Sequence, residues 1–144
     1  MTNYLVTGGC GFLGSNIASR LVEAGEQVTI ADNLSRTGST RNLTWLRNQG
    51  VLDFVTLDVR DAAAVDAFVS RVRPDVVLHL AGQVAMTTSL ADPRLDFEVN
   101  AAGSLNVLEA VRAHCPDAAV VYSSSNKVYG ELGSVRLEEA ERRY

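Results

Sequence analysis

The sequence predicts an α/β fold with a doubly wound parallel sheet, and three observations lead to this prediction. Short apolar segments typical of strands alternate along the chain with longer segments that have helical periodicity. Gly8, Gly11 and Gly14 follow the first strand candidate at Gly-x-x-Gly-x-x-Gly spacing, and Asp32 ends the second strand candidate. Because strand–helix–strand crossovers are right-handed, we expect the strand order 3-2-1-4-5, with a ligand crevice at the carboxyl ends of the strands.

The three glycines stand where the chain turns from a strand at 3–7 into a helix at 12–23. The first glycine of such a turn permits a tight bend, the second lets the backbone approach a pyrophosphate, and the third lets the helix pack on the strand. The N–H groups at the start of the helix would then bind the anion. A strand at 27–31 leads to Asp32, at the spacing of the carboxylate that binds an adenosine ribose, so this unit predicts dinucleotide binding. Gly25 is placed to end the helix. We expect its apolar side to contain Phe12, Leu13, Ile17, Leu21 and Val22.

The rest of the chain continues this alternation. Trp45 is interpreted as core or edge packing rather than as a ligand contact, and Asp61 is placed as the N-cap of a later helix. His79 lies in a nearly continuous apolar run typical of a central strand, so we interpret it as a packed residue with one satisfied nitrogen. The stretch 83–93 is expected to be irregular. The remaining strands are expected at 53–57, 76–82 and 118–122, and the remaining helices at 41–49, 62–71 and 95–113. The buried side of the last helix is expected to hold Val99, Ala102, Leu105, Val107, Leu108 and Val111.

The composition favours one globular domain. The chain has 144 residues, 47% of them hydrophobic, which is enough to bury a core. A net charge of -4 gives no basic surface for nucleic acid. The sequence has neither an apolar run of ~18 residues nor a signal-peptide pattern at its start. Cys10 and Cys115 are far apart in sequence and predict neither a disulfide framework nor a metal site. We therefore expect a cytoplasmic protein without a nucleic-acid or membrane partner.

Four motifs, taken in order, resemble those of the extended short-chain dehydrogenase/reductase family, and within it the NAD-dependent nucleotide-sugar epimerases and dehydratases. They lie at 7–14, 32–36, 79–82 and 123–130. Residues 81–89 together with 125–127 are most similar to the CDP-paratose 2-epimerases, also called CDP-tyvelose epimerases. The resemblance implies a Rossmann fold in which NAD+ takes a hydride from a sugar carbon and returns it to the other face of the keto sugar. It favours a CDP-linked deoxyhexose as substrate, with UDP-hexose 4-epimerisation as the alternative.

The family's site residues carry over onto matching positions of this sequence. Ser125 matches the position that hydrogen-bonds the reacting sugar hydroxyl, and Ser124, the other candidate catalytic residue, would lie with Ser123 beside the nicotinamide. Asp32 implies NAD rather than NADP, because a carboxylate repels a 2′-phosphate, whereas Arg36 favours the opposite. The resemblance assigns cofactor binding to Gly8, Gly11, Phe12, Leu13 and Gly14 at the pyrophosphate, Asp32, Asn33, Ser35 and Arg36 at the adenosine ribose, Asp58 and Val59 at the adenine, Leu80, Ala81 and Gly82 along the nicotinamide ribose, and Asn100 and Ser123 nearby.

Some of these positions have simpler structural interpretations. Asp58 could cap a turn, Asn100 could tie a helix to the sheet, and the serines at 123–125 could be a polar strand end. Members of the family often pair through helices, so the helix at 95–113 could form half of a homodimer contact. A non-catalytic NAD-binding module is the alternative to an enzyme.

The sequence departs from the family at the catalytic helix. The Tyr-x-x-x-Lys motif is absent, because the only lysine is Lys127 and the residue four positions before it is Ser123. The related 4,6-dehydratases carry Asp-Glu where this chain has Asn126 and Lys127, so dehydration is disfavoured. We therefore expect residues 1–130 to form an NAD-binding domain and the charged segment 131–144 to lead to a catalytic region outside this chain. The chain alone is expected to be inactive.

Overall fold

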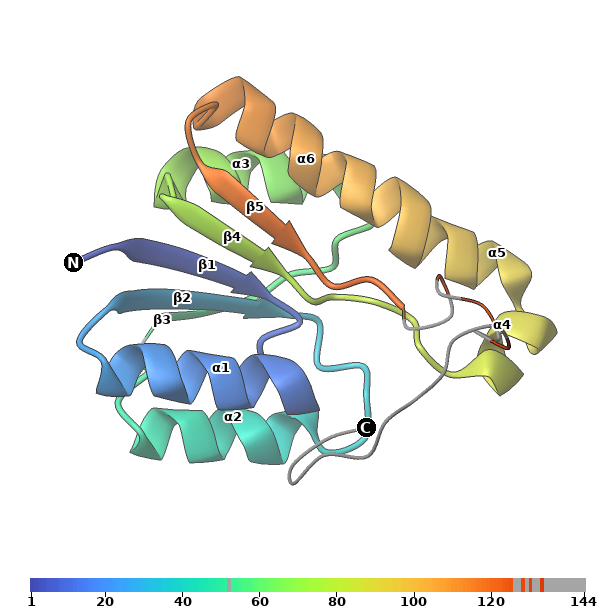
Figure 1. Ribbon diagram of the computed structural model, residues 1–144, viewed down its shortest axis with the longest axis horizontal. Coiled ribbons are helices and arrows are strands. Elements are labelled where there is room, and N and C mark those ends of the chain that lie inside the picture. The colour runs from blue at the N-terminus through green and yellow to red at the C-terminus, as the bar shows by residue number, and fades with distance from the viewer. Residues whose placement is uncertain (52, 126–127, 129, 131–132, 134–144) are drawn as a thin grey trace.

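The computed structural model describes residues 1–51, 53–125, 128, 130 and 133. Their strands form one five-stranded parallel sheet (Figure 1). Its strand order, β3-β2-β1-β4-β5, confirms the prediction. Thr7 at the end of β1 is paired with Ala31 of β2 and His79 of β4, so the carboxyl ends of these strands meet at one edge of the sheet. The strands are β1 (Asn3–Thr7), β2 (Gln27–Asp32), β3 (Asp53–Thr56), β4 (Val76–His79) and β5 (Ala119–Tyr122).

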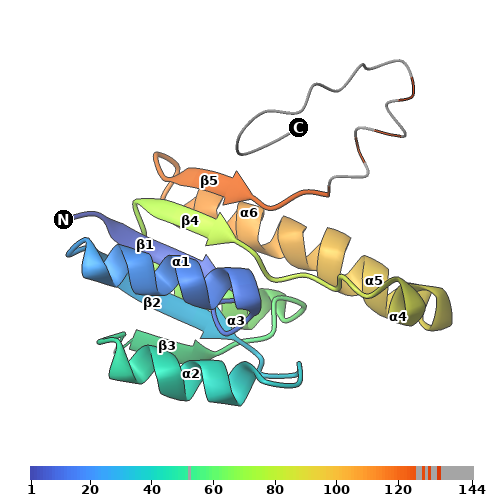
Figure 2. The same cartoon turned by 60° about the horizontal axis from the view of Figure 1, so that its bottom comes forward.

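Helices cover both faces of the sheet (Figure 1). α1 (Phe12–Glu23) and α2 (Ser39–Asn48) lie on one face, and α3 (Ala62–Val72) and α6 (Gly103–His114) lie on the other. The short helices α4 (Met86–Ala91) and α5 (Pro93–Phe97) lie beyond the carboxyl ends of the strands (Figure 2), and the π-helix η1 (Glu98–Ala102) joins α5 to α6. This is the doubly wound arrangement that the sequence predicts. None of the helices among the described residues is long and apolar enough to cross a membrane.

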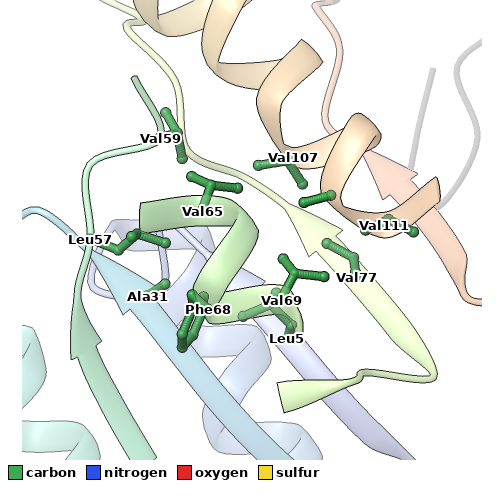
Figure 3. Close-up of a cluster of buried hydrophobic side chains, with 11 residues drawn as sticks. Leu5, Ala31, Leu57, Val59, Val65, Phe68, Val69, Val77, Val107 and Val111 are labelled. Carbon is green, nitrogen blue, oxygen red and sulfur yellow. The ribbon is translucent and has the colours of Figure 1, made fainter. Parts of the chain in front are cut away.

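The core consists of two clusters, one on each face of the sheet, because successive strand residues point to opposite faces. Leu5 of β1 belongs to the cluster beneath α3 and α6 (Figure 3), whereas its neighbour Val6 belongs to the cluster beneath α1 and α2. Burial on both faces explains why the central strands are almost continuously apolar in sequence. The cluster in Figure 3 comprises Leu5, Ala31, Leu57, Val59, Val65, Phe68, Val69, Val77, Val107, Ala110 and Val111.

One predicted element that follows β4 is wrong, because the stretch 83–93, expected to be irregular, contains α4. The helix predicted at 95–113 is confirmed as unbroken helical backbone from α5 to α6, although its middle part, η1, is a π-helix and it begins two residues earlier than predicted. Helical backbone begins at Pro93 because proline suits the first turn and the carboxylate of Asp92 accepts a hydrogen bond from Leu95 N at 2.9 Å. By contrast, the N-cap predicted at Asp61 is confirmed, since its carboxylate accepts from Ala64 N.

Part of the predicted helix burial is also wrong. Phe12 is 85% exposed and Leu13 49% exposed. The reason is that α1 turns small residues toward the sheet, so the helix lies close to it and its large apolar residues lie at the side or outside. Leu105 and Leu108 of α6 are 58% and 47% exposed. The buried residues of α1 are Gly14, Ser15, Ala18 and Ser19, and those of α6 are Gly103, Ser104, Val107, Ala110 and Val111.

Candidate functional site

The turn between β1 and α1 packs so closely that the fold requires two of the three glycines of the Gly-x-x-Gly-x-x-Gly motif, and also Gly9, where a Cβ would lie 2.7 Å from Ile30 Cβ. Gly8 has a φ of +69°, and a Cβ there would lie 2.7 Å from Ala81 N and 2.8 Å from the carbonyl carbon of Leu80. A Cβ on Gly14 would collide with the carbonyl oxygen of Gly8. Packing within the chain therefore explains all three of these glycines.

Gly11 differs from the other two glycines of the motif. Its φ of -72° and ψ of 174° suit any residue, and a Cβ there would approach one atom, the Gly8 carbonyl oxygen at 3.2 Å. Gly11 is the N-cap of α1, whose first-turn N–H groups have no partner within the helix and carry the positive end of its dipole. Glycine at this position therefore leaves open space in front of an anion-binding helix end, as a pyrophosphate requires.

The glycine turn forms one wall of a cavity of about 310 Å³ at the carboxyl ends of the strands. Its size is in the range of small-molecule sites, and it receives residues from the ends of β1, β2, β3 and β4. Most of the residues assigned to cofactor binding line it. They are Gly8, Gly11, Asp32, Asn33, Ser35, Arg36, Asp58, Val59, Leu80, Ala81 and Gly82.

Asp32 is held rigidly at the end of β2. Its Oδ2 accepts a hydrogen bond from Cys10 N at 3.0 Å, and its Oδ1 accepts one from Leu34 N at 2.8 Å. These bonds tie the carboxylate to the glycine turn on one side and to the loop after β2 on the other. Because a carboxylate has about four acceptor positions, each oxygen can still accept a hydrogen bond from a ligand hydroxyl.

Asp58 is fixed by charged and polar neighbours beyond β3. Arg60 donates to it twice, from Nε to Oδ1 at 3.0 Å and from Nη2 to Oδ2 at 2.7 Å, and Asn33 Nδ2 donates to Oδ2 at 3.2 Å. The bonds from the Arg60 guanidinium lower the pKa of Asp58 to about 2. Asp58 also accepts from Arg60 N at 3.0 Å, so it caps a turn as well as lining the cavity.

The segment that leaves β4 forms the opposite wall. The strand predicted at 76–82 ends at His79, and Ala81 N donates to the side chain of Thr7 at 3.4 Å instead of continuing the sheet. Asn100 of η1 holds the backbone of Gln83, donating from Nδ2 to its carbonyl at 2.9 Å and accepting from its N–H at 2.8 Å. Asn100 itself does not line the cavity, so its contacts tie helix to sheet and its cofactor role stays a prediction.

Several residues assigned from the resemblance do not line this cavity. Phe12 and Leu13 point to solvent, and Gly14 is buried beneath the turn. The serines at 123–125 follow β5 and are exposed, with Ser123 N donating to the carbonyl of His79 at 3.2 Å. Asn126 and Lys127 lie outside the described residues, as does most of the segment 131–144.

The structure adds residues that the sequence analysis did not assign to the site. Arg60 binds Asp58, and Leu95 and Val99 bring one turn of apolar surface from the helical segment beyond β4. The i, i+4 spacing of Leu95 and Val99 predicts an apolar helix side, but this spacing does not distinguish a side that lines a cavity from one that packs in the core. The added lining residues are Ala31, Ser39, Leu57, Arg60, Gln83, Leu95 and Val99.

The interpretation of His79 as a packed residue is confirmed, and both of its ring nitrogens are bonded rather than one. The residue is 2% exposed, with Nδ1 2.6 Å from Thr7 Oγ1 and Nε2 3.0 Å from Ser104 Oγ. Burial lowers the pKa of His79 to about 4. Trp45 is 40% exposed on α2 and is not among the lining residues.

Comparisons with known proteins show the family of the chain. A family model described as GDP-mannose 4,6 dehydratase matches residues 5–144. The chain is 50% identical over 140 residues to a CDP-paratose 2-epimerase of Salmonella typhi, covering 97% of this chain and 41% of that protein. It therefore spans about two fifths of the length of this relative.

Solved structures of epimerases share the fold. UDP-glucose-4-epimerase from Stenotrophomonas maltophila, with bound NAD and formylated UDP-arabinopyranose, matches with a TM-score of 0.81 and 32% identity, covering 90% of this chain and 39% of that one. Thermus thermophilus UDP-glucose 4-epimerase in complex with NAD matches with a TM-score of 0.69 and 43% identity, covering 78% of this chain and 34% of that one. The chain therefore belongs to the GDP-mannose 4,6 dehydratase family, within the extended short-chain dehydrogenases/reductases.

Proposed function

We propose that this chain is the cofactor-binding part of an NAD-dependent nucleotide-sugar epimerase and that its cavity binds NAD. One observation carries the proposal: Gly11 and Asp32 line the same cavity. Gly11 has a backbone conformation open to any residue, and a Cβ there would meet a single atom, the Gly8 carbonyl oxygen at 3.2 Å, whereas Asp32 is a carboxylate held by two backbone N–H groups. A pyrophosphate needs open backbone N–H groups, and a ribose needs a hydrogen-bond acceptor at a fixed position. The NAD bound in the two related epimerase structures supports this assignment.

Each wall of the cavity has a distinct task in the proposal. The N-terminus of α1 with Gly11 would hold the pyrophosphate, and Asp32 would accept hydrogen bonds from the adenosine ribose. Asp58 and Val59 would border the adenine, with the Arg60 guanidinium keeping Asp58 ionised and oriented. The segment at 80–83 would carry the nicotinamide ribose toward the serines that follow β5.

We propose that the cavity binds NAD in preference to NADP. The carboxylate of Asp32 would accept from a free 2′-hydroxyl, whereas a 2′-phosphate there would face like charge. Arg36 also lines the cavity, and its guanidinium favours a phosphate. The two bonds that Asp32 accepts from backbone N–H groups keep its carboxylate in place beside the ribose position.

NAD would supply the hydride acceptor and donor of a redox-neutral epimerisation. Ser125 would hydrogen-bond the reacting sugar hydroxyl, and Ser124 and Ser123 would border the nicotinamide. Their place immediately after β5, with Ser123 bonded to His79 at the end of β4, agrees with a site at the carboxyl edge of the sheet. The Tyr-x-x-x-Lys pair that removes the hydroxyl proton in the family is absent from the 144 residues, so turnover would need residues from outside this chain.

A CDP-linked deoxyhexose is the proposed substrate, because CDP-paratose 2-epimerase is the relative at 50% identity. UDP-hexose 4-epimerisation is the second candidate, supported by the UDP-glucose 4-epimerase structures. Dehydration is disfavoured by Asn126 and Lys127. A cytoplasmic location and a homodimer through α6, whose Leu105 and Leu108 are exposed, complete the proposal.

A titration of the purified chain with NAD+ and NADP+ tests cofactor binding. We expect NAD+ to bind more tightly, and Asp32→Asn to reduce the ratio of the two affinities. Asp53→Asn, which removes an exposed carboxylate at the start of β3, should leave the ratio unchanged. A folded wild-type chain that binds neither nucleotide, or that prefers NADP+, would contradict the proposal.

Complementation tests the epimerase part separately. The chain would be mixed with the C-terminal part of the Salmonella typhi CDP-paratose 2-epimerase, and epimerisation of CDP-paratose would be followed by NMR. Activity that depends on both parts supports the enzyme, and its loss in Ser125→Ala would support the role of that serine. A folded, NAD-loaded complex without activity would favour a non-catalytic NAD-binding module.

A further inference from the structure

His79 lies at the centre of a buried hydrogen-bond network that ends at the cavity wall. Its Nδ1 is 2.6 Å from Thr7 Oγ1, and its Nε2 is 3.0 Å from Ser104 Oγ. Thr7 Oγ1 also accepts from Ala81 N at 3.4 Å, and Ser104 Oγ donates to the carbonyl of Asn100 at 2.7 Å. The His79 network is defined as Thr7, His79, Ala81, Gln83, Asn100 and Ser104.

The partners of His79 determine where its proton lies. Ser104 has one hydroxyl proton, which it donates to Asn100, so its oxygen can only accept from the histidine. The Nε2 atom therefore carries the proton, and Nδ1 accepts from the Thr7 hydroxyl. This leaves the Thr7 oxygen free to accept from Ala81 N, so every bond of the series has one donor and one acceptor.

The two ends of the network hold the same segment. Ala81 is bonded through Thr7, and Gln83 is bonded by both polar atoms of the Asn100 amide. Ala81 and Gln83 line the cavity, and the backbone at Ala81 is also the surface on which Gly8 rests. His79 therefore joins β1, β4 and α6 behind the wall that residues 80–83 form, without lining the cavity itself.

We propose that His79 is a positioning residue for the cofactor site: its neutral Nε2–H form fixes residues 80–83 against the glycine turn and so sets the affinity for NAD. The proposal rests on the proposed function, because it takes NAD to be the ligand of the cavity. A histidine with only a packing role would stabilise the fold without affecting that affinity. The reversed proton arrangement, with the proton on Nδ1, would turn the Thr7 hydroxyl away and leave Nε2 and the Ser104 oxygen without a shared proton.

NMR of the imidazole nitrogens reads the proton position directly. In the full chain without cofactor at neutral pH, we expect the 15N shifts and proton couplings of a neutral ring protonated at Nε2. A ring protonated at Nδ1, or at both nitrogens, would overturn the proposal. The NMR signals of the other histidine, His114, which lies beside Asp66, are identified by their absence in His114→Gln.

Variants of the two hydroxyl residues test the effect on NAD. Thr7→Val keeps the side-chain shape and removes the hydroxyl, and Ser104→Ala removes the acceptor for Nε2–H. We expect each to weaken NAD+ binding about 3- to 10-fold, the effect of one hydrogen bond. Thr7→Ser keeps the hydroxyl that Thr7→Val removes, so it should bind NAD+ with the affinity of the wild type. Ser19→Ala, a buried helix serine outside the network, should have no effect.

Hydrogen exchange rates of the Ala81 and Gln83 amides measure how firmly the network holds this segment in the absence of the cofactor. Faster exchange is expected at Ala81 in Thr7→Val and at Gln83 in Ser104→Ala, and unchanged exchange at both would overturn the proposal. If the wild type binds NAD+ and both variants bind it equally well, His79 has only a packing role. If the wild type binds no NAD+, the proposed function fails, and the exchange rates still decide whether the network holds residues 80–83.

Discussion

Gly8→Ala, compared with Gly25→Ala, tests whether the turn after β1 is held against the end of β4. Both glycines have positive φ, +69° and +79°, so each alanine incurs the left-handed backbone cost of about 1–2 kcal/mol. A Cβ at Gly25 meets nothing within 4 Å, whereas one at Gly8 lies 2.7 Å from Ala81 N. Forcing that backbone apart adds roughly 1–3 kcal/mol of overpacking. We therefore expect losses of about 2–5 kcal/mol for Gly8→Ala and about 1–2 kcal/mol for Gly25→Ala.

Urea unfolding followed by far-UV circular dichroism measures both losses. Linear extrapolation gives the free energy of unfolding in water, and an unchanged m-value shows that the same surface is exposed in each variant. If the Gly8→Ala chain does not fold, its loss in the free energy of unfolding is at least as large as expected. Equal losses in the two variants would refute the reasoning, because they would show that the contact with Ala81 costs nothing beyond backbone strain.

Three further predictions concern the charged and capping groups. Burial lowers the pKa of His79 to about 4 from 6.5, so the unfolded chain binds more protons between these values and stability falls as pH drops through that window, by at most about 3 kcal/mol. His79→Gln should remove this pH dependence in unfolding experiments and His114→Gln should retain it; the reverse would contradict the assignment. Arg60→Ala should raise the pKa of Asp58 from about 2 toward 3.8 in an NMR titration of the carboxyl carbon, whereas an unchanged pKa would exclude the guanidinium as its cause. Asp61→Ala should cost about 1 kcal/mol in urea unfolding, because α3 loses its cap, without changing NAD+ affinity; a stability equal to the wild type would contradict the capping role.

The sheet and most of the cavity could be predicted because both depend on local sequence signals. Apolar strands flanked by helices determine the doubly wound order, and the residues just after each strand meet at one edge. For that reason Gly11, Asp32, Asp58 and Ala81, which are far apart in sequence, all line one cavity as expected. Each of them ends a strand or follows one within four residues, where a sequence pattern is informative.

The rest depends on contacts that no local pattern shows. Phe12 is exposed because small residues of α1 bring that helix close to the sheet, and the 3.6-residue period does not distinguish the two sides. Asn100, which lies in the wide turn of η1, bonds Gln83 across 17 residues. The bonds of His79 to Thr7 and Ser104 span 72 and 25 residues, so the sequence indicated burial of the ring but not its partners.

The affinity of Gly11→Ala for NAD+ tests the central claim most directly. This alanine keeps an ordinary φ, and its Cβ would meet the Gly8 carbonyl oxygen at 3.2 Å, which a shift of a few tenths of an ångström would relieve, so we expect stability within about 1 kcal/mol of the wild type. Its methyl group would occupy the space assigned to the pyrophosphate and weaken NAD+ binding roughly 10- to 100-fold. Gly25→Ala should lose stability and keep its affinity. A stable Gly11→Ala chain that binds NAD+ as tightly as the wild type would contradict the assignment of this cavity to the cofactor.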